Sequence, residues 1–348
     1  MLKKSFYSLI LMAGASALFA LPPHLGSTDY KASSINNLDF NLSWEDLQLE
    51  ATGANEIVVD IYCNNKKYAP KVKTSSGTLI IESVPSTSVV IGVQKKCTVI
   101  VKLPQDKDFD KVKIQTSSGD INSSVGFSAR DSISIGASSG DIKIEKQISA
   151  TKDAVIKTSS GSSYLEGISA KQLTASASSG NITVNRADSK TAVIHTSSGN
   201  IKLKNFQAVT FEGSASSGNI TGQNLDCQSF NVSTSSGTIG LEFSDAPAAK
   251  SSVTSSSGTQ YISMPRGSRI NVHVTTSSGG FTNAFTSEKL SSHADYNNAI
   301  NGGGAKVSLT STSGNITLDV GAGVASKRTA IEASDSDEIP VVIFDDVK

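Results

Sequence analysis

The triplet Ser-Ser-Gly recurs along the chain at an almost constant interval. From Gly119 to Gly279 the successive glycines are separated by 21, 21, 19, 19, 19, 19, 21 and 21 residues. A period of this length indicates a solenoid, in which each repeat is one coil that can bury its apolar face only against its neighbours. We call each triplet a corner; the corner glycines, the last of which follows Thr-Ser, are Gly77, Gly119, Gly140, Gly161, Gly180, Gly199, Gly218, Gly237, Gly258, Gly279 and Gly314.

Apolar and polar residues alternate on both sides of each corner. Ile133 and Ile135 precede one glycine, and Ile142 and Ile144 follow it, each pair with a polar residue between. A period of two is typical of a strand with one buried face. The pattern predicts an all-β fold, a single-domain parallel β-helix of about 19–21 residues per coil. We expect it to be right-handed, because crossovers between parallel strands favour that hand.

The residue types at the corner suggest how the turn is made. Glycine tolerates positive φ, so we expect it to let the chain turn sharply. The serine hydroxyls are expected to satisfy the backbone of the turn, although their regular rows could instead present hydroxyls to a glycan or to ice. The next residue is often Asp or Asn, and Asn181, Asn200 and Asn219 predict an amide ladder over three coils.

Two steps of the repeat are irregular. Gly77 and Gly119 are 42 residues apart, and the strand-like segment Cys97–Pro104 between them is interpreted as a degenerate coil. The other step, of 35 residues, contains segment 286–304, interpreted as a projecting loop or a second degenerate coil. The expected organisation is a signal peptide at 1–20, an N-terminal cap and first strands at 21–75, solenoid repeats at 76–318 and a C-terminal cap or flexible tail at 319–348.

The N-terminus has the features of a secretory signal. Lys3 and Lys4 precede the apolar run Ser5–Ala20, which ends in small residues and is short for a membrane span. We therefore expect an exported protein, periplasmic, at the cell surface or secreted, with no transmembrane segment after cleavage. Export permits a disulfide. Cys63 and Cys97 are the candidate pair, which leaves Cys227 as a buried or loop thiol.

The composition offers little support for catalysis or nucleic-acid binding. Basic and acidic residues balance at 31 each with no basic stripe, so no nucleic-acid partner is expected. Aromatic residues make up only 6%, which argues against stacking platforms for sugars. We predict no catalytic residue, no cofactor and no metal site.

Two acidic patterns have alternatives that remain open. Asp106, Asp108 and Asp110 alternate like calcium ligands, but the glycine and the distal glutamate of a calcium loop are missing, which favours a solvated loop. Asp120 and Asp141 should stack one coil apart. Such a pair could serve acid–base chemistry or could simply close two corners, and the second interpretation is favoured.

The segments Val99–Pro104, Val112–Ile121 and Gly302–Ile316, together with the repeated Ser-Ser-Gly-Asn-Ile coils, resemble the bacterial putative-adhesin repeat family. The resemblance covers residues 38–318. It implies an exported or envelope β-solenoid built from Ser-Ser-Gly-Asp/Asn coils, and no catalytic residues.

These observations favour a non-enzymatic exported β-solenoid that acts in adhesion, scaffolding or envelope interactions through its outer faces and loops. The partner class we expect is a glycan or a cell-surface or envelope protein. One alternative is a polysaccharide-active β-helix enzyme, which requires clustered acidic and basic side chains in a groove. Another is an envelope-stress sensing or ligand-binding module with segment 286–304 as its contact.

Overall fold

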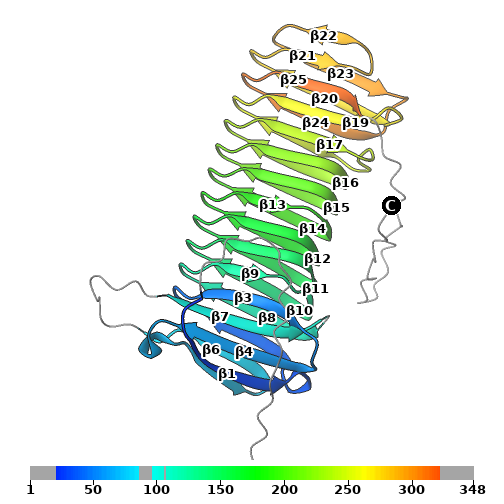
Figure 1. Cartoon of the computed structure of the whole chain (residues 1–348). Helices are drawn as coiled ribbons and strands as arrows, with labels where there is room; N and C mark the ends of the chain where they lie inside the picture. The colour runs from blue at the N-terminus through cyan, green and yellow to red at the C-terminus, as the bar shows by residue number, and fades with distance from the viewer. Residues whose placement is uncertain (1–20, 86–95, 106, 322–348) are drawn as a thin grey trace, which may run out of the picture.

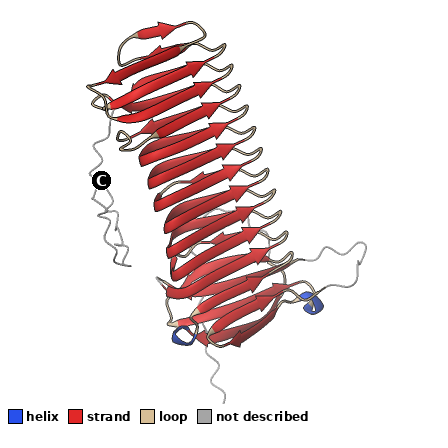
Figure 2. Ribbon diagram, turned by 180° about the vertical axis from the view of Figure 1, so that it is seen from behind, coloured by secondary structure: helices blue, strands red, loops and turns tan. Residues whose placement is uncertain are grey.

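The computed structural model describes residues 21–85, 96–105 and 107–321. They form a rod of stacked coils (Figure 1), and all 25 strands belong to one hydrogen-bonded sheet. Two short 3-10 turns, η1 (Ala32–Ser34) and η2 (Lys66–Tyr68), lie at the N-terminal end, as Figure 2 shows. The all-β solenoid predicted from the repeat is confirmed. The expected signal peptide at 1–20 lies outside the described residues.

The regular coils occupy the middle of the rod and follow the chain in order. Each strand segment pairs in parallel with the equivalent segment of the next coil, as between Ile201 and Ile220. The strands are β8 (Lys107–Thr116), β9 (Ile121–Ser123), β10 (Phe127–Ala137), β11 (Ile142–Thr158), β12 (Ser163–Ala177), β13 (Ile182–Val184), β14 (Ala187–Thr196), β15 (Ile201–Ala215), β16 (Ile220–Thr234), β17 (Ile239–Phe243), β18 (Ser251–Ser255) and β19 (Gln260–Pro265).

Register shifts divide the long strands into short segments, and these give each coil three faces. In β11 the paired segments are 142–144, 147–150 and 153–157. The residues that alternate inward are buried and stack in ladders. One such ladder contains only isoleucine over several coils, at Ile182, Ile201, Ile220 and Ile239. The apolar core is therefore a narrow column along the rod axis, and the polar positions between the ladders point outward.

Close contact between coils, rather than the sign of φ, explains the corner glycines. We expected positive φ at these glycines, but among them only Gly77 has it, so that expectation is wrong. A Cβ on Gly218 would instead lie 1.6 Å from the carbonyl oxygen of Gly199 in the coil before. Backbone contacts of this kind, at 1.7 to 2.0 Å, would also meet a Cβ at Gly119, Gly140, Gly161, Gly180, Gly199, Gly237, Gly258, Gly279 and Gly314.

Buried hydroxyl groups three residues before the glycine close several corners. The hydroxyl of Thr234 accepts a hydrogen bond from the amide of Gly237 at 3.1 Å and donates one to the carbonyl of Gly218 at 3.2 Å. Thr116 and Ser311 accept the amides of their own corner glycines in the same way. A hydroxyl at this position thus satisfies one buried backbone group in its own coil and, in Thr234, another in the coil before.

At the N-terminal end the order of coils in the stack differs from their order in the chain. β2 (Asn37–Asn41) and β3 (Asp46–Thr52) form one coil. It lies between the coil of β8 and β9 and the coil of β6 (Thr78–Glu82) and β7 (Cys97–Pro104). A Cβ on Gly119 would meet the carbonyl oxygen of Glu45, so Glu45 stands where later coils have glycine. An early segment is therefore inserted between two later ones.

Antiparallel strands cap this end. β4 (Glu56–Cys63) pairs with β7, and β1 (His24–Lys31) pairs with β4. Cys63 and Cys97 lie opposite each other across β4 and β7 and are joined by a disulfide, whereas Cys227 is buried in β16.

A hairpin completes the cap. β5 (Lys71–Ser75) pairs antiparallel with β6, and Ser76 and Gly77 form the turn between them with φ of 48° and 74°. Our assignment of Gly77 to a solenoid corner is therefore wrong. The triplet is present, but here it closes a tight hairpin, a turn that requires positive φ at both central residues.

The C-terminal end repeats the insertion. β24 (Ala305–Ser311) and β25 (Ile316–Gly321) are the last described strands of the chain, yet their coil is not the last in the stack. It lies between the coil of β18 and β19 and the coil of β20 (Ile270–Thr276) and β21 (Phe281–Asn283). The expected C-terminal region at 319–348 therefore begins within β25, and residues 322–348 lie outside the described part.

Segment 286–304 covers this end of the rod. It contains β22 (Glu288–Leu290) and β23 (Asp295–Ile300), which pair antiparallel with β21 and β20. The expectation of a projecting loop or a degenerate coil is wrong. An open sheet edge at the end of a solenoid invites pairing with another chain, and antiparallel strands cover it here.

Candidate functional site

The corner serine hydroxyls form an exposed row along one edge of the rod. The backbone amides of the corners continue the ladder between coils, as from Ser179 to Ser159 at 2.8 Å. Within the described residues, no hydrogen bond is made by the hydroxyls of Ser159, Ser178, Ser197, Ser216 or Ser235, and their residues are exposed. The expectation that these hydroxyls satisfy the turn backbone is therefore wrong, because buried threonines and backbone groups do so instead.

The Asp and Asn side chains after the corner glycines are used structurally. Asp120 accepts the backbone amide of Asp141 at 2.9 Å, and Asn181 accepts that of Asn200 at 2.9 Å. Asn200 continues the series by accepting the amide of Asn219, also at 2.9 Å. Each oxygen caps the next coil, which supports the interpretation of these residues as corner-closing and explains why either Asp or Asn can stand here.

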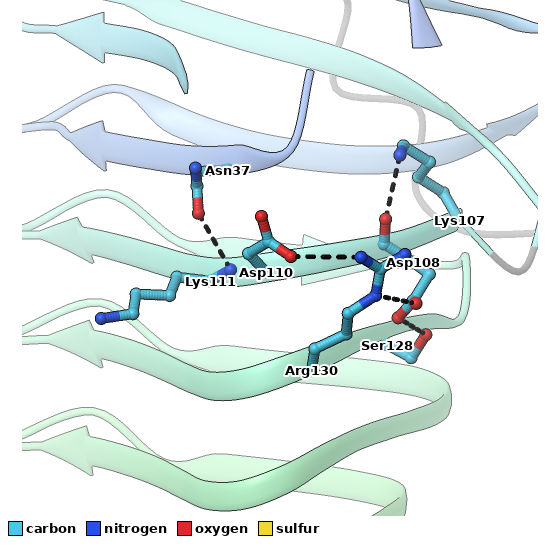
Figure 3. A network of polar contacts seen from close by, with 7 residues as sticks. All are labelled: Asn37, Lys107, Asp108, Asp110, Lys111, Ser128 and Arg130. Carbon is cyan, nitrogen blue, oxygen red and sulfur yellow. Dashed lines mark hydrogen bonds and ion pairs between the residues drawn. The ribbon is translucent and has the colours of Figure 1, made fainter. Parts of the chain in front are cut away.

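Asp108 and Asp110 take part in an ion-pair network on the outer face (Figure 3) and are not arranged as the ligands of a calcium loop. Arg130 reaches Asp108 at 2.9 Å through Nε and Asp110 at 3.5 Å through Nη1, and Ser128 donates to Asp108 at 2.7 Å. Asp106 lies outside the described residues. Arg130 is 70% exposed, so these pairs add little stability.

A second polar network lies on the face after the corners, where β11, β12 and β13 run side by side. Tyr164 donates to Glu166 at 2.6 Å, and Asn185 donates to both at 2.9 and 2.7 Å. Arg186 reaches the other Glu166 oxygen at 3.3 Å. The hydrogen bond to Glu166 and partial burial raise the pKa of Tyr164, and the same bond lowers the pKa of Glu166. Tyr164, Glu166 and Asn185 thus bond to one another, whereas the buried Nε of Arg186 has no hydrogen-bond partner among the described residues.

Further along the same face is a shallow groove of about 460 Å³. It crosses β15, β16, β17, β19 and β25. Its floor follows the outward ladder Lys202–Thr221–Gly240–Tyr261–Thr317, whose members are paired strand to strand. Gln223, Glu242, Ser263 and Asp319 line its side. We call this set of residues the groove.

Tyr261 is the residue of the groove that the sequence reasoning missed. This residue is 55% exposed, whereas the other exposed large apolar residues of the described chain, Leu21, Leu25 and Leu290, lie near the two ends. The low aromatic content argued against any sugar platform, but composition does not show where a single ring lies. The repeat frame offered a signal, because Tyr261 comes three residues after Gly258, a position that faces outward in every regular coil.

A smaller pocket of about 380 Å³ lies at the C-terminal end, between β20, β23 and β24. His273 bonds to Asn297 at 2.7 Å through Nδ1, and Asn271, Asn298 and Lys306 complete the lining. Within the described ranges, no group of three His, Cys, Asp or Glu side chains is placed to hold a metal ion. None of the helical segments in those ranges has the length and apolar character that a bilayer crossing requires.

The stacked parallel coils and the coils inserted at both ends define a β-solenoid protein of the repeat class. The chain belongs to the Toastrack DUF4097 family, whose model matches residues 35–319. The match covers the coils and both inserted segments. No curated protein is significantly similar to the chain.

Several solved structures are similar to the chain. A putative adhesin from Parabacteroides merdae has 14% identity and a TM-score of 0.47, covering 68% of this chain and 95% of that one. A putative lipid binding protein from Parabacteroides distasonis has 21% identity and a TM-score of 0.47, covering 68% and 96%. A putative adhesin from Bacteroides fragilis has 14% identity and a TM-score of 0.33, covering 84% and 95%.

Proposed function

We propose that the protein is an exported, non-enzymatic β-solenoid that acts in adhesion, scaffolding or envelope interactions through its outer face. The observation that carries this proposal is the groove. Elsewhere on the described surface, the acidic and basic groups of the two networks are bonded to one another. In the groove, Lys202 and Glu242 form no ion pair with any described residue, and the exposed ring of Tyr261 lies on β19, the strand next to that of Glu242.

Enzymatic activity on a polysaccharide is the weaker candidate. It requires acidic side chains that are free of structural hydrogen bonds, but Asp120 and Asp141 each accept a backbone amide. Glu242 and Asp319 do line the groove, with Ser263 between them in the strand ladder. Asp319 accepts the amide of Val320 at 2.8 Å, which commits one of its oxygens to the backbone.

Segment 286–304 is not favoured as the contact of a sensing module. Its strands bond to the last coil, and Tyr296 donates to Glu288 within the segment. That bond and the one from Thr286 lower the pKa of Glu288, which keeps its carboxylate charged. Glu288, Thr286 and Tyr296 are thus bonded to one another within the cap.

Two experiments test the proposal. The full chain is expressed in a bacterium, the cells are fractionated, and the N-terminus of the recovered protein is sequenced. We expect a mature N-terminus near residue 21 and no protein in the cytoplasm. The mature chain is then applied to an array of glycans and of envelope and matrix proteins, and polysaccharides are assayed for released reducing ends. Binding without release supports the proposal. Release of reducing ends, or no binding to any probe, contradicts it.

A further inference from the structure

The groove contains a hollow that the fold does not require. Gly240 occupies the outward ladder between Thr221 and Tyr261, and a Cβ built on it would meet no atom within 4 Å. At the corner glycines, by contrast, a Cβ would overlap the neighbouring backbone. Glycine in the interior of a strand weakens it and often marks a place where a ligand approaches closely. Packing therefore does not explain Gly240, but a ligand would.

The hollow lies directly beside the exposed ring. Gly240 and Tyr261 are partners in the pairing of β17 with β19, so the missing side chain uncovers the ring on the side of β17. An exposed aromatic face next to a space of this kind can stack against the C–H face of a sugar ring. Two further outward positions of the ladder, Thr221 and Thr317, carry hydroxyl groups, and that of Thr221 donates to the carbonyl of Ile201 at 3.4 Å.

The polar groups of the groove include both donors and acceptors. Lys202 supplies a cation, Glu242 and Asp319 supply carboxylates, and Gln223 and Ser263 supply an amide and a hydroxyl. A polyanion such as a nucleic acid or an anionic lipid surface requires an excess of cationic groups, and the groove has fewer cations than anions. A ligand with many hydroxyl groups can donate to the carboxylates and accept from the ammonium and amide groups.

The groove is open at the surface and extends across five strands. Strands in a sheet lie about 4.8 Å apart, so the ladder from Lys202 to Thr317 is about 19 Å long. A chain of several rings fits such a length better than one small molecule does. From these observations we propose that the groove binds a neutral saccharide chain with one ring stacked on Tyr261 in the hollow at Gly240. This inference rests on the proposed function and names its ligand class.

The test compares two substitutions, one that fills the hollow and one that removes the aromatic ring. Gly240→Thr fills the hollow with the residue type of the neighbouring ladder positions, and strands favour threonine, so the variant should fold at least as well as the parent. Tyr261→Thr removes the ring. Gly26→Thr is the matched control, because Gly26 also lies in a strand, β1, and a Cβ there would meet nothing within 4 Å.

Affinity electrophoresis of the mature chain is run in gels containing dextran, mannan, galactan, xylan or β-glucan, with polygalacturonate and heparin as polyanions. We expect at least one neutral polysaccharide to retard the parent and the Gly26→Thr control equally. We expect both groove variants to lose roughly tenfold or more in affinity, which is about 1.4 kcal/mol. Thermal unfolding of all four proteins shows whether a loss is due to the fold.

The outcomes separate the two proposals. Equal retardation of parent and groove variants overturns the saccharide site, and so does retardation by the polyanions alone. If no neutral polysaccharide retards the parent, the site is also overturned. If the array still shows binding to proteins in any of these cases, the proposed outer-face function remains. If the array shows no binding at all, both proposals fail.

Discussion

The two ends of the rod are closed by the same arrangement of strands but are fastened by different chemistry. At each end, one coil from a distant part of the sequence is inserted between two others, and antiparallel strands cover the final edge. The N-terminal end adds the Cys63–Cys97 disulfide and the buried carboxylate of Asp60, which bonds to Lys102 at 2.9 Å. The C-terminal end relies mainly on neutral hydrogen bonds.

Gln260 shows how the C-terminal end is fastened. It stands in the ladder position that isoleucine fills in the preceding coils, and it is fully buried. Its Nε2 donates to Ser255 at 2.9 Å and to the carbonyl of Thr310, in the inserted coil, at 2.6 Å. Ser255 also bonds to Ser311 at 3.2 Å. Both ends therefore close by inserting a coil from a distant part of the sequence. A disulfide or a buried ion pair stabilises only one of them, so neither is needed for closing the solenoid.

The largest loss of unfolding free energy should come from substituting the glycines that contact the inserted coils. A Cβ on Gly119 would lie 2.0 Å from the backbone of Glu45, and one on Gly279 would lie 2.0 Å from that of Gly314. Gly119→Ala and Gly279→Ala should each cost about 4 kcal/mol of unfolding free energy, because backbone must move. Urea unfolding measures this, with Gly26→Ala as the control. If only one of the two variants is destabilised, the ends do not share one solution.

The disulfide should give the next largest effect, and only at one end. It closes a loop with a sequence separation of 34 residues, so its removal should cost about 3–4 kcal/mol by loop entropy. Reductant should lower the urea midpoint of the parent and leave a Cys63→Ala/Cys97→Ala variant unchanged. Hydrogen exchange should accelerate in β4 and β7 but not in β20 and β23. Equal acceleration at both ends would show that they are coupled.

Asp60 should make the N-terminal end sensitive to acid. Burial alone would raise the pKa of Asp60, but the hydrogen bonds from Lys102 and Ser27 and the charges of Lys102 and His24 outweigh it and lower that pKa. A lowered pKa gives stability that is present above the unfolded value of about 3.9 and is lost as pH falls further. Asp60→Asn should cost about 2 kcal/mol at pH 7.

The acid test for Asp60 uses unfolding at neutral pH and at low pH. The cost of Asp60→Asn should shrink as pH falls below about 4, because the parent then loses the same charge. Asp319→Asn, at the exposed rim of the groove, is the matched control and should change little at either pH. If the loss of unfolding free energy in Asp60→Asn did not depend on pH, Asp60 would stabilise this end through its packing and not through its charge.

The smallest effect should come from Gln260. Gln260→Ile loses two hydrogen bonds but removes Oε1, a buried oxygen without a partner, and restores the apolar ladder. The two terms offset each other, so unfolding free energy should change by less than about 1 kcal/mol. Hydrogen exchange of β24 should nevertheless accelerate, because the bond to Thr310 is gone. Unchanged exchange in β24 would show that Gln260 does not fasten the inserted coil.

The middle of the rod could be predicted from the sequence, and the ends could not. The period of two around each glycine fixes which residues are buried, and Ile133 and Ile135 are buried as predicted. The insertion of β2 and β3 gives no such signal, because Ser43-Trp44-Glu45 stands in place of Ser-Ser-Gly and the pairing spans more than 70 residues. Pairing between segments so distant depends on tertiary fit rather than on local pattern.

The role of the glycines and the place of the groove show a similar limit. Residue type alone does not distinguish a glycine needed for positive φ, as at Gly77, from one needed for close contact, as at Gly218. The repeat frame does place Gly240 and Tyr261 at outward positions, so the two could have been noticed. That they are partners across β17 and β19 follows only once the coils are stacked.

The insertion of β24 and β25 has a consequence for how the molecule is made. These strands leave the ribosome, and would pass through any export channel, after β20–β23, yet they lie beneath β20 and β21 in the finished stack. The rod therefore cannot be completed by adding coils in the order of synthesis. The place for β24 and β25 must stay open until they arrive, so we expect this end of the rod to close only after residues 305–321 have been released.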